Sequence, residues 1–108
     1  MLREFADRRD WQQFHSPRNL VLALVGEVGE LAAEFQWIAD ADESRLNVPE
    51  TKSAIGAEMA DVLSYLLRLS DVLCIDLEEA VVTKISQNEL RYPVESSRGS
   101  ARKYTAYE

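Results

Sequence analysis

Four acidic residues stand at matching positions in two apolar segments, and their spacing is the feature with the clearest chemical content. Glu27 and Glu30 lie three residues apart in ALVGEVGELAAEFQW, and Glu58 and Asp61 lie three residues apart in a second such segment. Residues at this spacing share one face of a helix, so each helix would present a carboxylate pair beside its apolar stripe. If the two helices pack side by side, the four carboxylates converge.

Four converging carboxylates repel one another and resist joint ionisation. A hard divalent cation relieves that repulsion, and all-oxygen ligation suits Mg²⁺ or Mn²⁺. Because Mg²⁺ also binds substrate phosphates, the pattern indicates a nucleotide or polyphosphate substrate. The simpler interpretation is a solvated helix face, but two matched pairs on apolar helices favour the metal site. A di-iron carboxylate bundle needs Glu-x-x-His pairs, and the only histidine, His15, lies outside any such motif.

Helical periodicity covers most of the chain, and no segment alternates convincingly with the period of a strand. Ser16 followed by Pro17 is typical of a helix N-terminus, and Asp76 with Glu79 forms a capping-box pattern. We therefore expect an all-α, small four-helix bundle in one domain, residues 1–108. The expected helices cover residues 3–14, 17–38, 49–73 and 77–92, with a polar loop over 39–48 and an irregular basic tail over 92–108.

The apolar residues of the two long helices form stripes that predict a core. Their positions are Leu20, Leu24, Leu31, Phe35 and Ile38 in one helix, and Ile55, Met59, Val62, Leu66, Leu69 and Leu73 in the other. A second set widens the apolar arcs beyond one stripe: Leu22, Val25, Val28, Leu63 and Leu67. A chain this short cannot cover both sets, so we expect homo-oligomerisation to complete the bundle.

Composition restricts the class of function. The formal net charge of −7 argues against a nucleic-acid-binding surface. The single cysteine, Cys74, excludes an internal disulfide and favours a reducing compartment. The charged start carries no apolar region of a secretory signal, and the longest apolar run, residues 20–26, is far shorter than a membrane span. We expect a cytoplasmic protein with no nucleic-acid or membrane partner.

Longer stretches of the sequence resemble a known family. A helix with ExxE followed by one with ExxD is the motif of the MazG-like all-α nucleoside triphosphate pyrophosphohydrolases. The stretches RDWQQFH, LALVGEVGEL, EMADVLSYLLRL, DLEEAVVTKISQNELRYPV and RGSARKYT look most similar to the dCTP pyrophosphatases within that family. The resemblance covers nearly the whole chain except residues 39–52. One departure is Gly26, where many MazG-like proteins carry a first glutamate before the one at Glu27.

The resemblance implies helical homo-oligomers, dimers or tetramers, that bind Mg²⁺ and split a nucleoside triphosphate into the monophosphate and pyrophosphate. It places the catalytic metal ligands at Glu27, Glu30, Glu58 and Asp61. The substrate would be dCTP or a modified cytosine nucleotide, in the service of nucleotide-pool cleaning. A broad-specificity dNTP pyrophosphohydrolase and a non-catalytic helical nucleotide-binding or interaction protein stay open as alternatives.

Several further residues are candidates for substrate binding. Trp11 and Trp37 could stack on a base or fill a core, and the resemblance favours base contact. His15 follows Trp11 by four residues and could bind the base or sugar, or simply end the first helix. Tyr65 lies one turn beyond Asp61, where its hydroxyl could touch the sugar.

A polar, basic face is expected on the fourth helix. Lys84, Asn88 and Arg91 fall at offsets of zero, four and seven residues, so they share that face. Such a face is usually solvated. The match through KISQNELRYP favours a phosphate clamp instead, because lysine and arginine pair with phosphate oxygens.

Overall fold

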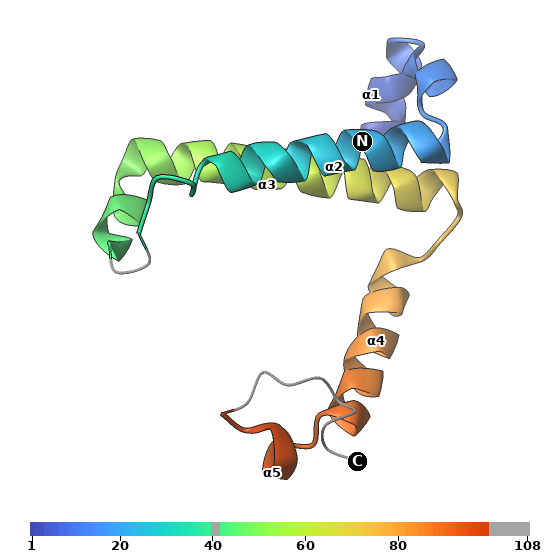
Figure 1. Cartoon of the computed structure of the whole chain (residues 1–108). Helices are drawn as coiled ribbons and strands as arrows, with labels where there is room; N and C mark the ends of the chain where they lie inside the picture. Colours follow the sequence, from blue (N-terminus) through green and yellow to red (C-terminus); the bar gives the residue numbers. More distant parts are fainter. Residues whose placement is uncertain (40–41, 100–108) are drawn as a thin grey trace. The chain divides into compact units, whose positions relative to one another are not determined.

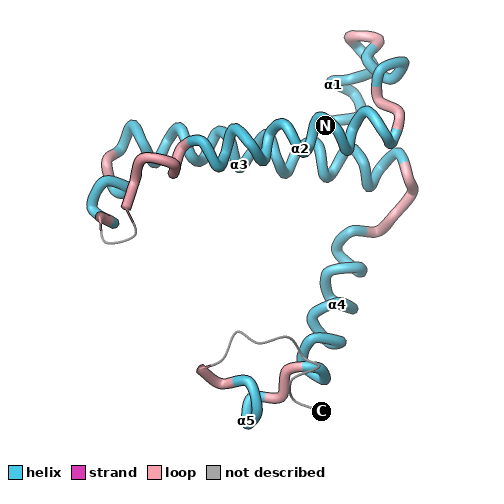
Figure 2. The backbone as a smooth tube through the Cα atoms, viewed as in Figure 1, coloured by secondary structure: helices cyan, strands magenta, loops and turns pink. Residues whose placement is uncertain are grey.

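The structure, a computed structural model, describes residues 1–39 and 42–99, and these form helices and turns with no strand among them. Figures 1 and 2 show the α-helices and their order. Their bounds are α1 Leu2–Arg8, α2 Pro17–Ala33, α3 Pro49–Val72, α4 Leu77–Arg91 and α5 Val94–Ser97. Two 3₁₀ helices are added, η1 Trp11–Phe14 and η2 Glu43–Asn47. The all-α prediction is confirmed.

The chain divides into two compact units, Met1–Cys74 and a second that begins at Ile75, and each is described by itself. In the first unit α2 and α3 run side by side in opposite directions, and α1 packs against α3 (Figure 1). The second unit contains α4 and α5. The pairing of α2 with α3 is the feature that brings the two acidic segments together.

Two helix starts form as their sequences predict. The Ser16 hydroxyl accepts a hydrogen bond from the Asn19 backbone N–H at 3.2 Å, with Pro17 at the first helical position of α2. The Asp76 carboxylate accepts from the Glu79 N–H at 3.0 Å and begins α4. Each cap satisfies a backbone donor that the helix itself leaves without a partner.

The prediction of one continuous helix over residues 3–14 is wrong. Asp10 has a left-handed backbone with φ of 53°, so α1 ends at Arg8 and a separate η1 follows. Aspartate tolerates this conformation better than most residues do. The Gln13 side-chain amide donates to the Asp10 carbonyl and to its carboxylate, each at 3.0 Å, and so stabilises the break.

The second expected helix also ends early. The α-helix stops at Ala33 rather than at Ile38, and the N–H groups of Phe35 and Ile38 bond to carbonyls three residues back at 3.0 Å each. This pattern belongs to tighter turns, which are common at helix C-termini. The guanidinium of Arg45 donates to the Trp37 carbonyl at 3.0 Å and ties this turn to η2.

Two segments that we expected to be irregular contain short helices. The polar loop over 39–48 forms η2, and the tail begins with α5. The Ser97 hydroxyl donates to the Tyr92 carbonyl at 3.1 Å and to the Pro93 carbonyl at 2.6 Å, which closes the α5 turn. Residues 40–41 and the tail from residue 100 onward lie outside the described residues.

The first unit has a very small core of its own. Among the described hydrophobic residues only Ala6 and Leu20 are fully buried. Met59 and Leu73, which we assigned to the core stripe of α3, are exposed, as is Phe35 of the other stripe. The five residues predicted to widen the apolar arcs are all exposed: Leu22, Val25, Val28, Leu63 and Leu67. Despite this apolar surface, no helix in the described part of the chain is long and apolar enough to cross a membrane.

Candidate functional site

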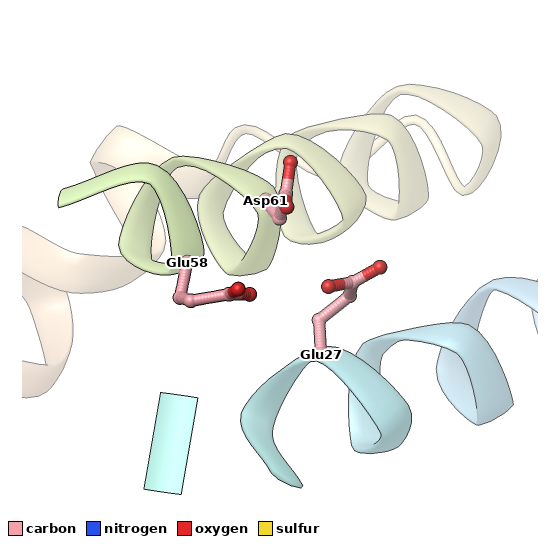
Figure 3. Close-up of side chains that lie close together, drawn as sticks. All are labelled: Glu27, Glu58 and Asp61. Atoms are coloured by element: carbon pink, nitrogen blue, oxygen red, sulfur yellow. The ribbon is translucent and has the colours of Figure 1, made fainter. Parts of the chain in front are cut away.

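Three of the four predicted carboxylates meet between α2 and α3. One oxygen from each of Glu27, Glu58 and Asp61 lies within 4.8 Å of the others. Figure 3 shows Glu58 and Asp61 on α3 and Glu27 across from them on α2. Glu27 and Glu58 are half-buried, whereas Asp61 is exposed. The antiparallel packing of two amphipathic helices therefore assembles an acidic group from residues about 30 positions apart in the sequence.

The electrostatics of this group fit a bound cation. The Oε2 atoms of Glu27 and Glu58 are buried without a hydrogen-bond partner among the described residues. Burial and the neighbouring carboxylates raise the pKa of Glu27 and that of Glu58. Buried charged oxygens without partners are costly, and a divalent cation would supply the missing positive charge. The oxygen-only donor set suits a hard cation.

Glu30 lies beside this group without being one of its three members. It contributes to the raised pKa of both Glu27 and Glu58, so its carboxyl group is close to theirs. Glu30 itself is exposed. The structure thus brings all four predicted acidic residues to one place and leaves Glu30 at its solvent edge.

A cavity of about 330 Å³ adjoins the acidic group. Its lining is Leu2, Phe5 and Ala6 of α1, Trp11, His15, and Asp61, Ser64, Tyr65 and Arg68 of α3. Asp61 belongs to both the cavity and the acidic group. Asp10, with its left-handed backbone, ends α1, which packs against α3, and Trp11 of the following η1 lines the same cavity as the α3 residues.

Three predicted substrate residues meet in this cavity: Trp11, His15 and Tyr65. They also line a second, neighbouring cavity of about 300 Å³. The ring of Trp11 lies edge-on to Phe5, with centroids 5.6 Å apart, and edge-on to His15 at 6.4 Å. An aromatic and mostly apolar wall of this size suits a planar base.

The other predicted substrate residues lie elsewhere. Trp37 is 79% exposed, follows the C-terminal end of α2, and lines neither of these cavities. Lys84, Asn88 and Arg91 are exposed on α4, which belongs to the second unit. The structure of the first unit therefore gathers part of the predicted substrate site.

Two residues of this region were missed by sequence reasoning. Arg68 lines the larger cavity and is only 8% exposed, and Asp71 forms an ion pair with it at 2.9 Å. An arginine within the apolar stretch SYLLRLSD, with an aspartate three residues later, was the available signal.

Comparison with known proteins identifies the family. The model of the MazG-like family matches residues 23–106, a stretch that contains all four acidic residues. The chain belongs to the MazG-like family. The acidic group between α2 and α3 thus lies inside the part of the chain that matches the MazG-like family.

Individual relatives carry more specific names. The chain is 54% identical over 103 residues to dCTP pyrophosphatase 1 of Rattus norvegicus and 50% identical to that of Homo sapiens. Each match covers 94% of this MazG-like chain but 61% of the relative's length. The fold is similar to the crystal structure of a pyrophosphatase from Archaeoglobus fulgidus, with a TM-score of 0.78, 44% identity and 85% of each chain covered.

Proposed function

We propose that this chain is a nucleoside triphosphate pyrophosphohydrolase that converts dCTP, or a modified cytosine nucleotide, into the monophosphate and pyrophosphate. The observation that carries the proposal is that Asp61 is shared by the acidic group and the aromatic cavity. This arrangement would place a base against Trp11 and the phosphates against a metal site. The names of the rat and human relatives support the substrate.

Glu27, Glu30, Glu58 and Asp61 are the residues that would hold the metal, for which we propose Mg²⁺, with Mn²⁺ as a chemical substitute. When bound, Mg²⁺ would neutralise phosphate oxygens and lower the pKa of a coordinated water. The reaction adds water at the α-phosphorus, and the bond to the bridging oxygen of the β-phosphate breaks, releasing pyrophosphate. Glu30 is exposed and is not one of the three residues whose oxygens meet, so it is our choice to orient the water or accept its proton.

The remaining predicted residues receive substrate-binding roles in the proposal. Trp11 stacks on the base, His15 bonds its edge, and Tyr65 contacts the sugar. Lys84, Asn88 and Arg91 would form a phosphate clamp, since their spacing gives α4 one basic face.

The assembled enzyme would contain more than one copy of the chain. Trp11 precedes the N-terminal end of α2, whereas Trp37 follows its C-terminal end. The 17-residue helix between them is roughly 25 Å long. A base held by both tryptophans therefore requires two copies. The exposed apolar residues of α2 and α3 supply the surface for that contact. We propose a dimer or tetramer that works in the cytoplasm, where the lone Cys74 stays reduced.

The direct test is to incubate the purified chain with dCTP and Mg²⁺ and to follow dCMP and pyrophosphate. We expect both products in equal amounts, with turnover abolished by EDTA. Glu58→Gln should lower kcat/KM by about 100-fold, because it removes one metal ligand. Glu43→Gln, an exposed glutamate on η2, is the matched control and should retain full activity.

Parallel reactions with dATP, dTTP, dGTP and CTP would define the substrate class. Equal rates on all dNTPs would contradict dCTP specificity and support the broad-specificity alternative. Release of single phosphate would contradict the proposed scissile bond. Absence of turnover on these substrates and on modified cytosine nucleotides would refute the proposed enzymatic activity. The non-catalytic nucleotide-binding alternative would then remain.

A further inference from the structure

A chain of charged hydrogen bonds runs from the surface of α1 to the imidazole of His15. Arg68 Nε donates to His15 Nδ1 at 3.2 Å, and Arg68 Nη1 donates to Asp71 Oδ2 at 2.9 Å. Arg3 Nε donates to the same Asp71 oxygen at 3.0 Å, and Arg3 Nη2 donates to the other oxygen. Asp71 thus accepts hydrogen bonds from two guanidinium groups, and that of Arg68 also donates to His15.

The partner of His15 determines which of its ring nitrogens carries the proton. A guanidinium only donates hydrogen bonds and stays charged at any physiological pH. The Nδ1 atom that receives this bond must therefore present a lone pair, and the proton of the neutral ring lies on Nε2. Burial and the neighbouring positive charge also lower the pKa of His15, which favours the neutral ring.

We propose that Arg68, anchored by Asp71 and Arg3, is a positioning residue that fixes His15 as the Nε2–H tautomer and so makes it a dedicated hydrogen-bond donor to the base in the cavity. Arg68 and His15 line the same 330 Å³ cavity as Trp11 and Tyr65. The Nε2–H is the polar group that the imidazole can still offer to a ligand there. The inference rests on the proposed use of this cavity for a nucleotide base.

A fixed donor would discriminate between pyrimidines. Cytosine presents an unprotonated N3, which accepts from Nε2–H, whereas uracil and thymine present N3–H, which meets it donor to donor. A site that leaves polar groups unpaired with the wrong base rejects that base. If the imidazole could change tautomer, its Nε2 would accept from the N3–H of uracil and the discrimination would fall. Arg68 therefore sets specificity through His15 rather than by touching the base.

The tautomer can be measured without turnover. His15 is the only histidine in the chain, so its two ring nitrogens give unambiguous ¹⁵N NMR signals. In the wild-type protein we expect Nδ1 to show the downfield shift of an unprotonated nitrogen and Nε2 the upfield shift of a protonated one. In Arg68→Met both shifts should move toward the averaged values of a mixed population. Arg8→Met, an exposed arginine in the last turn of α1, is the control and should keep the wild-type shifts.

The specificity consequence is measured as the ratio of kcat/KM for dCTP to that for dUTP. We expect this ratio to fall by about fivefold or more in Arg68→Met, the equivalent of one neutral hydrogen bond. The change should appear mainly in KM for dCTP, because a contact with the base is made equally in the ground and transition states. Arg8→Met should leave both constants unchanged.

Should Arg68→Met fail to fold, Asp71→Asn takes its place. Asp71 is 32% exposed at its side chain, so a neutral isostere is tolerable there, and it removes the anion that anchors Arg68. We expect a smaller shift of the ¹⁵N signals and of the dCTP-to-dUTP ratio, in the same direction.

The two proposals fail in different ways. A wild-type His15 that carries its proton on Nδ1, or shifts that do not respond in Arg68→Met, would overturn the positioning role whatever the activity. An unchanged dCTP-to-dUTP ratio in an active Arg68→Met enzyme would overturn the specificity role alone. A fixed Nε2–H tautomer in a protein that hydrolyses no nucleotide would refute the proposed function and with it the role of Arg68 in base choice.

Discussion

Among the described acids and the histidine of the first unit, four have shifted pKa values, two raised and two lowered. Burial and neighbouring acids raise the pKa of Glu27 and Glu58, so their ionised forms destabilise the metal-free fold at neutral pH. The pKa of Asp71 is lowered by its hydrogen bond to Arg3, and the pKa of His15 is lowered by burial and by the Arg68 charge. Acidic pH therefore relieves the destabilisation caused by ionised Glu27 and Glu58, and it weakens the stabilising interactions of Asp71 and His15 with the arginines.

We predict that Mg²⁺ stabilises the protein and that Glu58→Gln removes this effect. At Mg²⁺ concentrations about 100-fold above the dissociation constant, a single site stabilises a fold by about 2.7 kcal/mol. The metal-free Glu58→Gln variant should be at least as stable as the metal-free wild type, because it relieves like-charge repulsion. Thermal melts with and without Mg²⁺ measure both effects. An Mg²⁺ response that survives in Glu58→Gln would contradict the ligand assignment, and Glu43→Gln should melt like the wild type.

We predict that His15 makes the fold sensitive to mild acid. Its pKa in the folded state lies below the unfolded value of 6.5, so its contribution to stability is complete above pH 6.5 and is lost as pH falls through the folded pKa. The wild type should therefore lose stability relative to His15→Gln between about pH 7.5 and pH 5. Urea unfolding of both proteins at several pH values gives the difference. Contributions from Glu27 and Glu58 cancel in that difference, and a pH-independent gap would contradict the prediction.

At the scale of the elements, local signals predicted what local interactions determine. The positions of α2, α3 and α4 were predicted to within a few residues from the caps at Ser16 and Asp76 and from the apolar stripes. Capping and periodicity depend on residues that are close in the sequence, so they can be recognised there. The break at Asp10 was missed, because helical periodicity continues through it and the left-handed residue is not a glycine. The early end of α2 reflects a tightening of the last turns that periodicity does not register.

The candidate site likewise has features that depend on local sequence and features that depend on tertiary packing. The acidic pairs could be predicted from spacing within each helix, and the packing of α2 on α3 then joined them. The bond between Arg68 and His15 could not be predicted, because it joins residues 53 positions apart and depends on the path of the chain through η1. Contacts of this kind are set by tertiary packing, to which single-sequence patterns are blind.

We predict that the backbone at Asp10 controls the cavity. Asp10→Val places a β-branched residue in a left-handed conformation and should cost about 1–2 kcal/mol. Asp10→Gly relieves backbone strain and loses the Gln13 hydrogen bond to the carboxylate, so it should cost less. Urea unfolding ranks the variants, and KM for dCTP should rise in Asp10→Val because Trp11 directly follows the turn. Equal stability of the two variants would show that the turn is not under conformational constraint.

At the scale of the whole molecule, the main feature is apolar surface that one chain leaves uncovered. Val25, Val28, Leu63 and Leu67 are all more than 40% exposed, on the two helices that carry the acidic residues. Exposed apolar residues in such number are typical of a surface that another chain covers. The second unit adds Val81, Val82 and Ile85 of α4, which are exposed as well.

We predict that a charge on this surface dissociates the assembly. The wild type should sediment as a dimer or tetramer, and Val25→Glu should shift it toward the monomer by burying an unpaired charge. Ser53→Glu, an exposed position of α3 outside the apolar set, should leave the assembly intact. Sedimentation velocity across a range of concentrations tests both. A monomeric wild type would contradict the proposed homo-oligomer.

The small core of the first unit has a consequence for how the protein responds to dilution. With Ala6 and Leu20 as its fully buried apolar side chains, the described part of a single chain has few tertiary contacts to offset its conformational entropy. If copies complete the core, folding and assembly share one equilibrium whose position depends on chain concentration. The proposed pyrophosphohydrolase activity per chain would then rise steeply with expression level, so a cell could switch it off by lowering the abundance of the chain alone, with no inhibitor.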